Sequence, residues 1–150
     1  MAKTYHFKKY SLVEGGIHVN LDLTRFDEQL QRAQYYLDSQ VMNDMVPFMP
    51  MQTGTLINNT RARSAAMAGT GKVCAAAPPY GRFQYMGKVM IDPVTGSPWA
   101  RKGAKKIVTD RPLTYSNPRA VPFWFDEAKK TSSAKWIKGV KQRAGGEKTS

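Results

Sequence analysis

Hydrophobic and polar residues alternate without interruption over the segment 17–23, which reads Ile-His-Val-Asn-Leu-Asp-Leu. A period of two is typical of a strand with one buried face. The Gly15-Gly16 pair directly before this segment is a turn signal. We therefore expect a half-buried strand after a glycine turn, with His18 on its polar face.

The next pattern has the period of an α-helix. Apolar residues recur at steps of three and four and form one stripe, which consists of Phe26, Leu30, Ala33, Leu37, Val41 and Met45. Thr24 is a suitable N-cap with Asp27 three positions later, and Pro47 ends the pattern. The spacing predicts a long helix from Thr24 to about Val46.

The middle of the chain is rich in turn residues and predicts short extended segments. After Pro47 we expect a loop that leads into a strand near Leu56, and then a mobile loop over 65–71. A turn is expected over 92–98, because this segment contains two prolines and a glycine. Further strands are expected over 73–77, 82–86, 88–91 and 107–109.

A second helix is predicted over 123–140, with apolar residues on one side and lysines on the other. The order of strand, long helix, several strands and helix predicts an α+β fold. We expect a single domain over 1–150, in which the long N-terminal helix and the C-terminal helix pack on a mainly antiparallel sheet. Flexible termini are expected at about 1–12 and 144–150.

The charge of the chain is strongly positive and uneven. The formal net charge is +12. Residues 1–100 contain 10 Lys and Arg against 7 Asp and Glu, whereas residues 101–150 contain 13 against 4. This asymmetry is typical of a segment that faces a polyanion or an acidic protein surface. A solvated, lysine-rich helix and tail would give the same composition, so both interpretations remain open.

The composition also indicates the class of protein and the cellular compartment in which it folds. A hydrophobic content of 41% and a charged content of 23% are typical of a globular protein. Cys74 is the only cysteine, which excludes an internal disulfide, and its small apolar surroundings favour a buried, unreactive thiol. We find neither a secretory signal nor a membrane-spanning segment in the sequence. We expect a protein that folds in a cytoplasm and has no membrane partner.

The candidate catalytic and binding residues do not form a recognisable set. The segment 69–72, Gly-Thr-Gly-Lys, lacks both the earlier glycine and the following hydroxyl residue of a phosphate-binding loop. His6 and His18 are the only histidines, and neither has a partner at metal-ligand spacing. Asp126 and Glu127 are adjacent in a predicted first helical turn, where they complement the helix dipole. We expect no enzyme, no cofactor and no metal.

A basic loop is expected near 92–106, between two strands. Its cations are Arg101, Lys102, Lys105 and Lys106. These side chains are suited to DNA phosphates or to an acidic partner, and Trp99 beside Arg101 resembles the pairs on which single strands stack. We find no helix-turn-helix, zinc finger or RNA-binding aromatic motif. Any DNA contact is therefore expected to be electrostatic and independent of sequence.

Three segments carry a resemblance to a known family. The first follows the long helix and contains Asp44, Pro50, Thr53, Gly54 and Leu56. The second contains Tyr80, Gln84, Tyr85 and Gly87. The third contains Trp124, Phe125, Asp126 and Ala128, with Trp136 downstream. In this order and approximate spacing, over about 15–140, the chain resembles a family of phage minor capsid proteins, which is similar to the neck or tail-completion proteins of siphophages.

The resemblance implies a structural virion protein that forms a ring, expected to be hexameric, at the head–tail junction. Such a ring joins the portal, adaptor and stopper complex to the tail tube and lines the DNA path. The implied partners are other copies of the chain, the adjacent head-completion and tail terminator or tube proteins, and genomic DNA bound non-specifically. Assembly in the host cytoplasm is implied. A tail terminator, a head-closure protein and a sequence-nonspecific DNA-binding protein remain alternatives.

Overall fold

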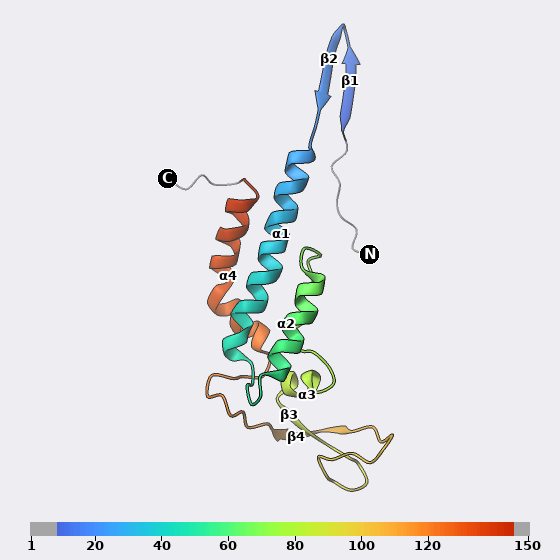
Figure 1. Cartoon of the computed structure of the whole chain (residues 1–150), viewed down its shortest axis with the longest axis vertical. Helices are drawn as coiled ribbons and strands as arrows, with labels where there is room; N and C mark the ends of the chain where they lie inside the picture. The colour runs from blue at the N-terminus through green and yellow to red at the C-terminus, as the bar shows by residue number, and fades with distance from the viewer. Residues whose placement is uncertain (1–8, 146–150) are drawn as a thin grey trace.

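The computed structural model describes residues 9–145 of the chain. Helices and short antiparallel strands alternate along it, which confirms the α+β class (Figure 1). In chain order the elements are β1 (Tyr10–Glu14), β2 (Ile17–Leu21), α1 (Thr24–Met45), η1 (Val46–Phe48), α2 (Thr55–Met67), α3 (Gly81–Met86), β3 (Lys88–Ile91), β4 (Ile107–Pro112) and α4 (Trp124–Arg143).

Two long antiparallel helices form the body of the molecule. α1 and α4 lie side by side, and in the view of Figure 1 α1 runs between α4 and α2. Their core is centred on four fully buried residues: Met45, Met49, Trp124 and Ala128. The helices approach closely at Gly139, because a Cβ at this position would lie 2.3 Å from the Tyr36 ring.

The described strands form two separate two-stranded antiparallel sheets at opposite ends of this body (Figure 1). β1 and β2 are joined by Gly15 and Gly16, whose φ angles of 60° and 80° suit a two-residue hairpin turn. β3 and β4 pair near the other end, below α3. The strands predicted over 17–23, 88–91 and 107–109 are confirmed, although the first ends at Leu21. The expectation that this first strand is half-buried is wrong for the single chain: every residue of β2 is exposed, because the hairpin projects away from the body (Figure 1).

The long N-terminal helix is confirmed as α1, but its start differs in detail from the prediction. Thr24 is the first helical residue rather than the N-cap, and the carboxylate of Asp22 accepts a hydrogen bond from the Thr24 N–H at 3.0 Å. The Thr24 hydroxyl also donates to Asp22, and these bonds lower the pKa of Asp22 to about 2. The Asp22 side chain, directly after β2, thus holds the turn between β2 and α1.

The loop and strand predicted over 48–60 are wrong in part, because the helix α2 begins at Thr55. Its buried side chains are Ile57, Thr60 and Ser64, at helical spacing. Two of the three carry hydroxyls, so the buried stripe has no continuous apolar pattern. The hydroxyls instead accept hydrogen bonds from the following segment: Thr60 from the Ala77 N–H at 3.1 Å and Ser64 from the Cys74 N–H at 3.1 Å.

Three other predictions for the middle of the chain are corrected. The predicted strand over 82–86 is the short helix α3, which Gly87 ends in a left-handed conformation. The segment 73–77 is irregular and is held by the α2 hydroxyls rather than by a strand ladder. The expected loop over 65–71 belongs to α2 as far as Met67.

The C-terminal helix predicted over 123–140 is α4, which begins at Trp124 and continues to Arg143. α1 and α4 pack mainly on each other rather than on one shared sheet. Residues 10–12, which we expected in a flexible terminus, form the first part of β1. Ala144, in the predicted C-terminal flexible segment, caps α4 by donating its backbone N–H to the Val140 carbonyl. Residues 1–8 and 146–150 lie outside the described residues.

Candidate functional site

Asp44 near the end of α1 joins the first and third motif segments. The Trp136 indole Nε1 donates a hydrogen bond to its Oδ2 at 2.7 Å, and the Lys135 Nζ lies 3.2 Å from its Oδ1. The Gln40 amide donates to Oδ1 at 3.1 Å. Burial raises the pKa of Asp44, but these donors outweigh it and lower the pKa overall. The Phe125 ring stacks on Trp136, also on α4, with centroids 6.5 Å apart; Trp136 is buried in the core and Phe125 packs against it.

Tyr85 on α3 joins the second motif segment to the third. Its ring packs edge-on against Trp124, with centroids 4.7 Å apart, and against Phe123, with centroids 5.3 Å apart. The indole of Trp124 also donates to the Ala75 carbonyl at 2.8 Å. Burial, and then the nearby negative charge of Asp126, raise the pKa of Tyr85. These contacts place half of the motif in the core, where it stabilises the fold.

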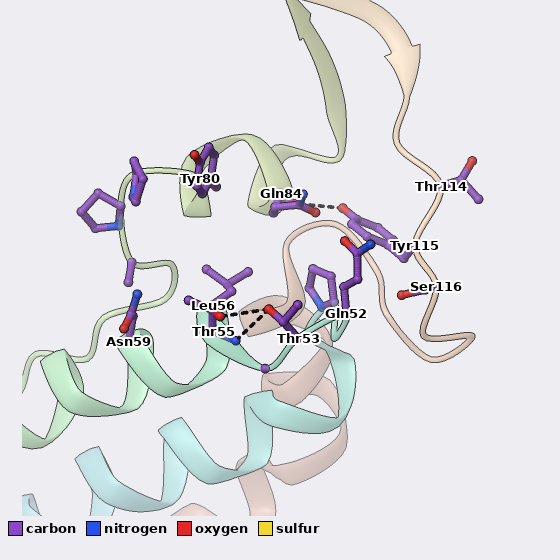
Figure 2. A pocket seen from close by; sticks show the side chains of 15 residues that line it. Gln52, Thr53, Thr55, Leu56, Asn59, Tyr80, Gln84, Thr114, Tyr115 and Ser116 are labelled. Carbon is purple, nitrogen blue, oxygen red and sulfur yellow. Dashed lines mark hydrogen bonds between the residues drawn. The ribbon is translucent and has the colours of Figure 1, made fainter. Parts of the chain in front are cut away.

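The other motif residues gather around a cleft between the start of α2, the start of α3 and the segment 114–116 (Figure 2). Its volume is about 440 Å³. The motif supplies Pro50, Thr53, Gly54, Leu56, Tyr80 and Gln84. Gly54 adopts a φ of 79° at the turn into α2, a left-handed conformation that favours glycine. The motif thus has two structural parts, one in the core and one around this cleft.

The cleft has no charged wall. None of its 15 lining residues is Asp, Glu, Lys, Arg or His. The Tyr115 hydroxyl donates to the Gln84 carbonyl at 2.6 Å, while the side-chain amides of Gln52, Asn59 and Gln84 have no hydrogen-bond partner among the described residues. Neutral amides beside proline, leucine and tyrosine surfaces suit an uncharged polypeptide segment. They do not suit a phosphate, which requires cations or converging N–H groups.

Asp92 organises the basic loop from inside. Its fully buried carboxylate accepts hydrogen bonds from the backbone N–H groups of Val94 at 2.9 Å and Arg101 at 3.1 Å. The Arg101 Nε donates to the same carboxylate at 2.9 Å, in an ion pair. The Arg101 guanidinium, together with these N–H groups, holds the pKa of Asp92 well below its usual range. One carboxylate therefore ties the turn after β3 to the segment that contains Arg101.

The four predicted cations lie in this loop, but they are not equivalent. Arg101 is engaged by Asp92, and the Lys106 Nζ donates to the Pro98 carbonyl. Lys102 and Lys105 are exposed and form no ion pair with any described residue. The loop projects at the β3–β4 end of the molecule, away from β1 and β2 (Figure 1). Contact of these cations with DNA or an acidic partner stays a prediction.

The glycine-rich segment 69–72 binds a carboxylate of its own chain. The N–H groups of Gly69 and Gly71 donate to Oδ2 of Asp38 on α1, at 2.8 and 3.0 Å. The two N–H groups that converge here as in an anion site are therefore already occupied. No local pattern predicts this contact, because Asp38 lies more than thirty positions earlier.

Comparison with known proteins decides which family these features belong to. The family model described as minor capsid protein matches residues 17–144. The chain belongs to this family. The match confirms the resemblance carried by the three motif segments, and it identifies the protein as a structural component of a phage virion. No curated protein and no solved structure matches the chain.

A structural family favours the expectation that the minor capsid protein is not an enzyme. Among residues 9–145 we find no group of three or more His, Cys, Asp or Glu placed to hold a metal ion. No helix in that part of the minor capsid protein is long and apolar enough to cross a membrane. Cys74 is partly buried and is not paired.

Sequence reasoning missed the residue that orders the basic loop of the minor capsid protein. Asp92 has a recognisable signal, because Asp at the first position of a Pro- and Gly-containing turn commonly accepts N–H groups two and three residues later. It does accept from Val94 and Thr95, the latter at 3.4 Å. Its ion pair with Arg101 spans a longer loop and has no such local signal.

Proposed function

We propose that this minor capsid protein forms a hexameric ring at the head–tail junction of the phage particle. There it joins the portal, adaptor and stopper complex to the tail tube and lines the DNA path. Its partners are other copies of itself, a head-completion protein and a tail terminator or tube protein. Membership of the family supports a place in the virion, and one uncovered surface supports self-association.

That surface is the apolar face of the β1–β2 hairpin, which carries the proposal. Leu12 pairs with Val19, and Ile17 and Leu21 follow on the same face because side chains alternate along a strand. These four side chains are 44–66% exposed. The opposite face is more polar and includes Ser11, His18 and Asn20. Apart from Glu14, which pairs with Ile17 beside the turn, these side chains make one side of the hairpin apolar, yet that side is in contact with water.

The hairpin cannot cover this face with its own body. It extends beyond the start of α1, away from α2 and α4 (Figure 1). Isolated two-stranded hairpins are marginally stable in water, and contiguous exposed apolar surface marks an interaction site. Phe26 and Leu30 add exposed apolar surface on the first turns of α1. A different surface of a neighbouring copy can cover this patch, and such heterologous contacts close into a ring.

Cryo-electron microscopy of intact particles, focused on the portal-to-tail junction, tests the proposal. We expect density for this chain as a symmetric ring of six copies between head and tail, with the β1–β2 hairpin against the adjacent subunit. Absence of the chain from that junction would refute the assignment. A ring that leaves the hairpin in solvent would keep the location but refute the proposed mode of self-association.

The proposed DNA path has its own test, because the chain carries a net charge of +12 and its basic loop is exposed. Reversal of Lys102, Lys105 and Lys106 to Glu is expected to impair assembly or DNA delivery. Reversal of Lys129, Lys138 and Lys141, which are exposed on α4, changes the net charge by the same amount and is the matched control. Normal assembly and delivery after the loop reversal would remove the loop from the mechanism.

Two alternatives share part of this support. A tail terminator or head-closure protein of the same region would also form a ring, and its layer in the particle density distinguishes it. A sequence-nonspecific DNA-binding protein is favoured by the positive charge alone. It would bind duplex DNA as a free monomer, with an affinity that falls steeply as salt rises.

A further inference from the structure

The basic loop contains the most exposed large apolar side chains among the described residues. Trp99 is 84% exposed and Val94 is 71% exposed. The other two tryptophans, Trp124 and Trp136, are 0% and 6% exposed. Tryptophan is usually well buried in a folded chain, and it is among the residue types most enriched at the dominant contacts of protein interfaces. The exposure of Trp99 therefore requires an explanation beyond the fold of the subunit.

The loop is ordered before any partner binds. The Asp92 carboxylate receives N–H groups from both sides of the loop, and the Arg101 guanidinium closes the same contact. The Lys106 Nζ adds a bond to the Pro98 carbonyl, next to Trp99 in the chain. These contacts fix the loop in the free chain. A loop fixed in this way loses little additional conformational entropy on association.

The same contacts determine which groups face outward. Arg101 and Lys106 are engaged within the loop, whereas Lys102 and Lys105 form no ion pair with the described residues. The outward surface therefore combines two apolar side chains, Trp99 and Val94, with two ammonium groups. The one carboxylate of the loop, Asp92, is fully buried and neutralised by Arg101.

We infer that Trp99 anchors a protein–protein contact in which the basic loop docks onto a different virion protein, at an apolar pocket rimmed by carboxylates. The inference deepens the proposed function, because it names the chemistry of the neighbour that this end of the ring meets. Trp99 and Val94 fill the pocket, and Lys102 and Lys105 pair with the rim and orient the approach.

Duplex DNA fits this surface less well than a protein does. The bases of a duplex are stacked and its phosphates recognise cations, so an indole gains little there. Three cations of this loop form no ion pair with the described residues, and one of them, Lys106, is held back by the Pro98 carbonyl, so two free ammonium groups accompany the two apolar side chains. The combination is that of an interface core with a charged rim. The Arg101 side chain is 55% exposed, but its charge is already paired with Asp92, whereas a phosphate-binding surface would leave a guanidinium without a carboxylate partner.

Oxidative footprinting read by mass spectrometry tests the contact at single-residue level. The samples are the free chain, the chain assembled alone, intact particles, and particles emptied of DNA. We expect Trp99 to be oxidised rapidly in the first two samples and at least tenfold more slowly in both kinds of particle. Trp124 and Trp136, buried in the free chain, are internal controls that should stay protected throughout.

Three results would overturn the inference. Trp99 as reactive in particles as in the free chain would show that nothing covers it. Protection that disappears when the DNA is ejected would assign the contact to DNA. Protection already complete in the chain assembled alone would assign it to a second copy. None of these readouts depends on where in the particle the chain lies, so failure of the head–tail location is detected separately by microscopy.

Substitutions of Trp99 test the same contact through incorporation of the chain into particles. Trp99→Ala is expected to reduce incorporation of the chain into particles at least tenfold, whereas Trp99→Phe retains most of it. Both should fold, because the indole is 84% exposed. Met51→Ala, at a side chain that is 58% exposed and outside the loop, is the matched control and should incorporate normally. Normal incorporation of Trp99→Ala would contradict the anchoring role.

Discussion

The two β-hairpins of this protein are similar locally but differ in how they are held. Every residue of β2 is exposed, and the β1–β2 hairpin touches the rest of the chain mainly through its connection to α1. The β3–β4 hairpin is tied to the body: the Leu113 N–H donates to the Gly87 carbonyl at 2.8 Å, and the Tyr115 hydroxyl donates to the Gln84 carbonyl at 2.6 Å. The residues of β3 are all partly buried.

This difference shows that contacts within the subunit hold the two ends of the molecule to different extents. The β3–β4 end is tied to α3 within the subunit and presents an ordered loop, although most of β4 and the Trp99 side chain are exposed. The β1–β2 end leaves an apolar face uncovered and is completed only by another molecule, as our proposal requires. Substitutions that break the ties of the β3–β4 hairpin to the body should therefore lower subunit stability. Substitutions on the two uncovered surfaces, the apolar face of the β1–β2 hairpin and Trp99 in the basic loop, should weaken association.

The largest effect on stability is expected at the anchor of the β3–β4 end. Gly87 has a φ of 65°, and a Cβ there would lie 2.6 Å from the Pro122 Cβ. Gly87→Ala should lower the free energy of unfolding by about 3 kcal/mol, because backbone strain and a steric clash add. Urea denaturation measures this.

Gly103→Ala is the matched control for Gly87→Ala. Gly103, in the basic loop, also has a positive φ, of 79°, but a Cβ at this position would have no atom within 4 Å. We expect a loss of about 1 kcal/mol from strain alone. Equal losses at both positions would show that the Pro122 contact does not hold this end of the molecule.

The next effect concerns association rather than stability. Leu12→Ser removes an apolar side chain that is 61% exposed in the subunit, on the uncovered face of β1. We expect the dissociation constant of the assembled chain to rise at least tenfold, which is about 1.4 kcal/mol. Subunit stability should change by less than about 0.5 kcal/mol, as for surface substitutions generally. Analytical ultracentrifugation and urea denaturation measure the two quantities.

Val13→Ser tests whether only one face of the β1–β2 hairpin takes part in association. Val13 is 59% exposed, almost the same as Leu12, but it lies on the opposite side of the hairpin. The dissociation constant of this variant should lie within about twofold of the value for the natural chain. Association depends only on the apolar area that the contact removes from water. Equal effects of the two serine variants would refute a one-sided interface.

A smaller effect is expected from a single hydrogen bond at the β3–β4 end. Tyr115→Phe removes the hydroxyl that binds the Gln84 carbonyl, and burial raises the pKa of Tyr115 so that this donor stays protonated. The loss should be about 1 kcal/mol in urea denaturation. Tyr80→Phe, at a ring that is 68% exposed, should have no measurable effect. A loss at Tyr80 as large as at Tyr115 would contradict the assignment.

The smallest effect on the stability of the whole chain is expected when acid protonates Asp92 in the basic loop. The folded pKa of Asp92 is depressed, so its stabilisation is present above the ordinary carboxyl pKa of about 3.9 and is lost as pH falls through the folded value. The protection of the Val94 and Arg101 amides against hydrogen exchange, measured relative to the intrinsic rate at each pH, should decrease below about pH 4. In Asp92→Asn the exchange should be fast at neutral pH already. Acid also weakens Asp22 beside β2, so the comparison requires residue-level NMR.

The elements in which apolar residues recur with a clear period could be predicted from the sequence. The apolar stripe of α1 and the alternation of β2 repeat often enough to be recognised, and both are confirmed. α2 was missed because its buried positions include Thr60 and Ser64, whose hydroxyls bond to another segment. α3 was missed because six residues are too few to display a helical period.

The site could be predicted only as a set of residues, not as an arrangement. The motif segments indicated which positions matter, but Asp44 and Trp136 are 92 positions apart, and no local pattern links them. The division of the motif between core and cleft depends on such long-range contacts. Asp92 shows the same limit, because its turn is a local signal whereas its pairing with Arg101 depends on how the loop closes.

The position of α1 between the two ends has an evolutionary consequence. With 22 residues, α1 is about 33 Å long, and among residues 9–145 it is the element that connects the β1–β2 hairpin to the body. Inserting one residue would turn the hairpin by about 100° relative to the basic loop, since a helix has 3.6 residues per turn. Side chains along this helix can drift during descent, but insertions and deletions within it should be eliminated, because they would turn the hairpin out of line with the neighbours at the other end.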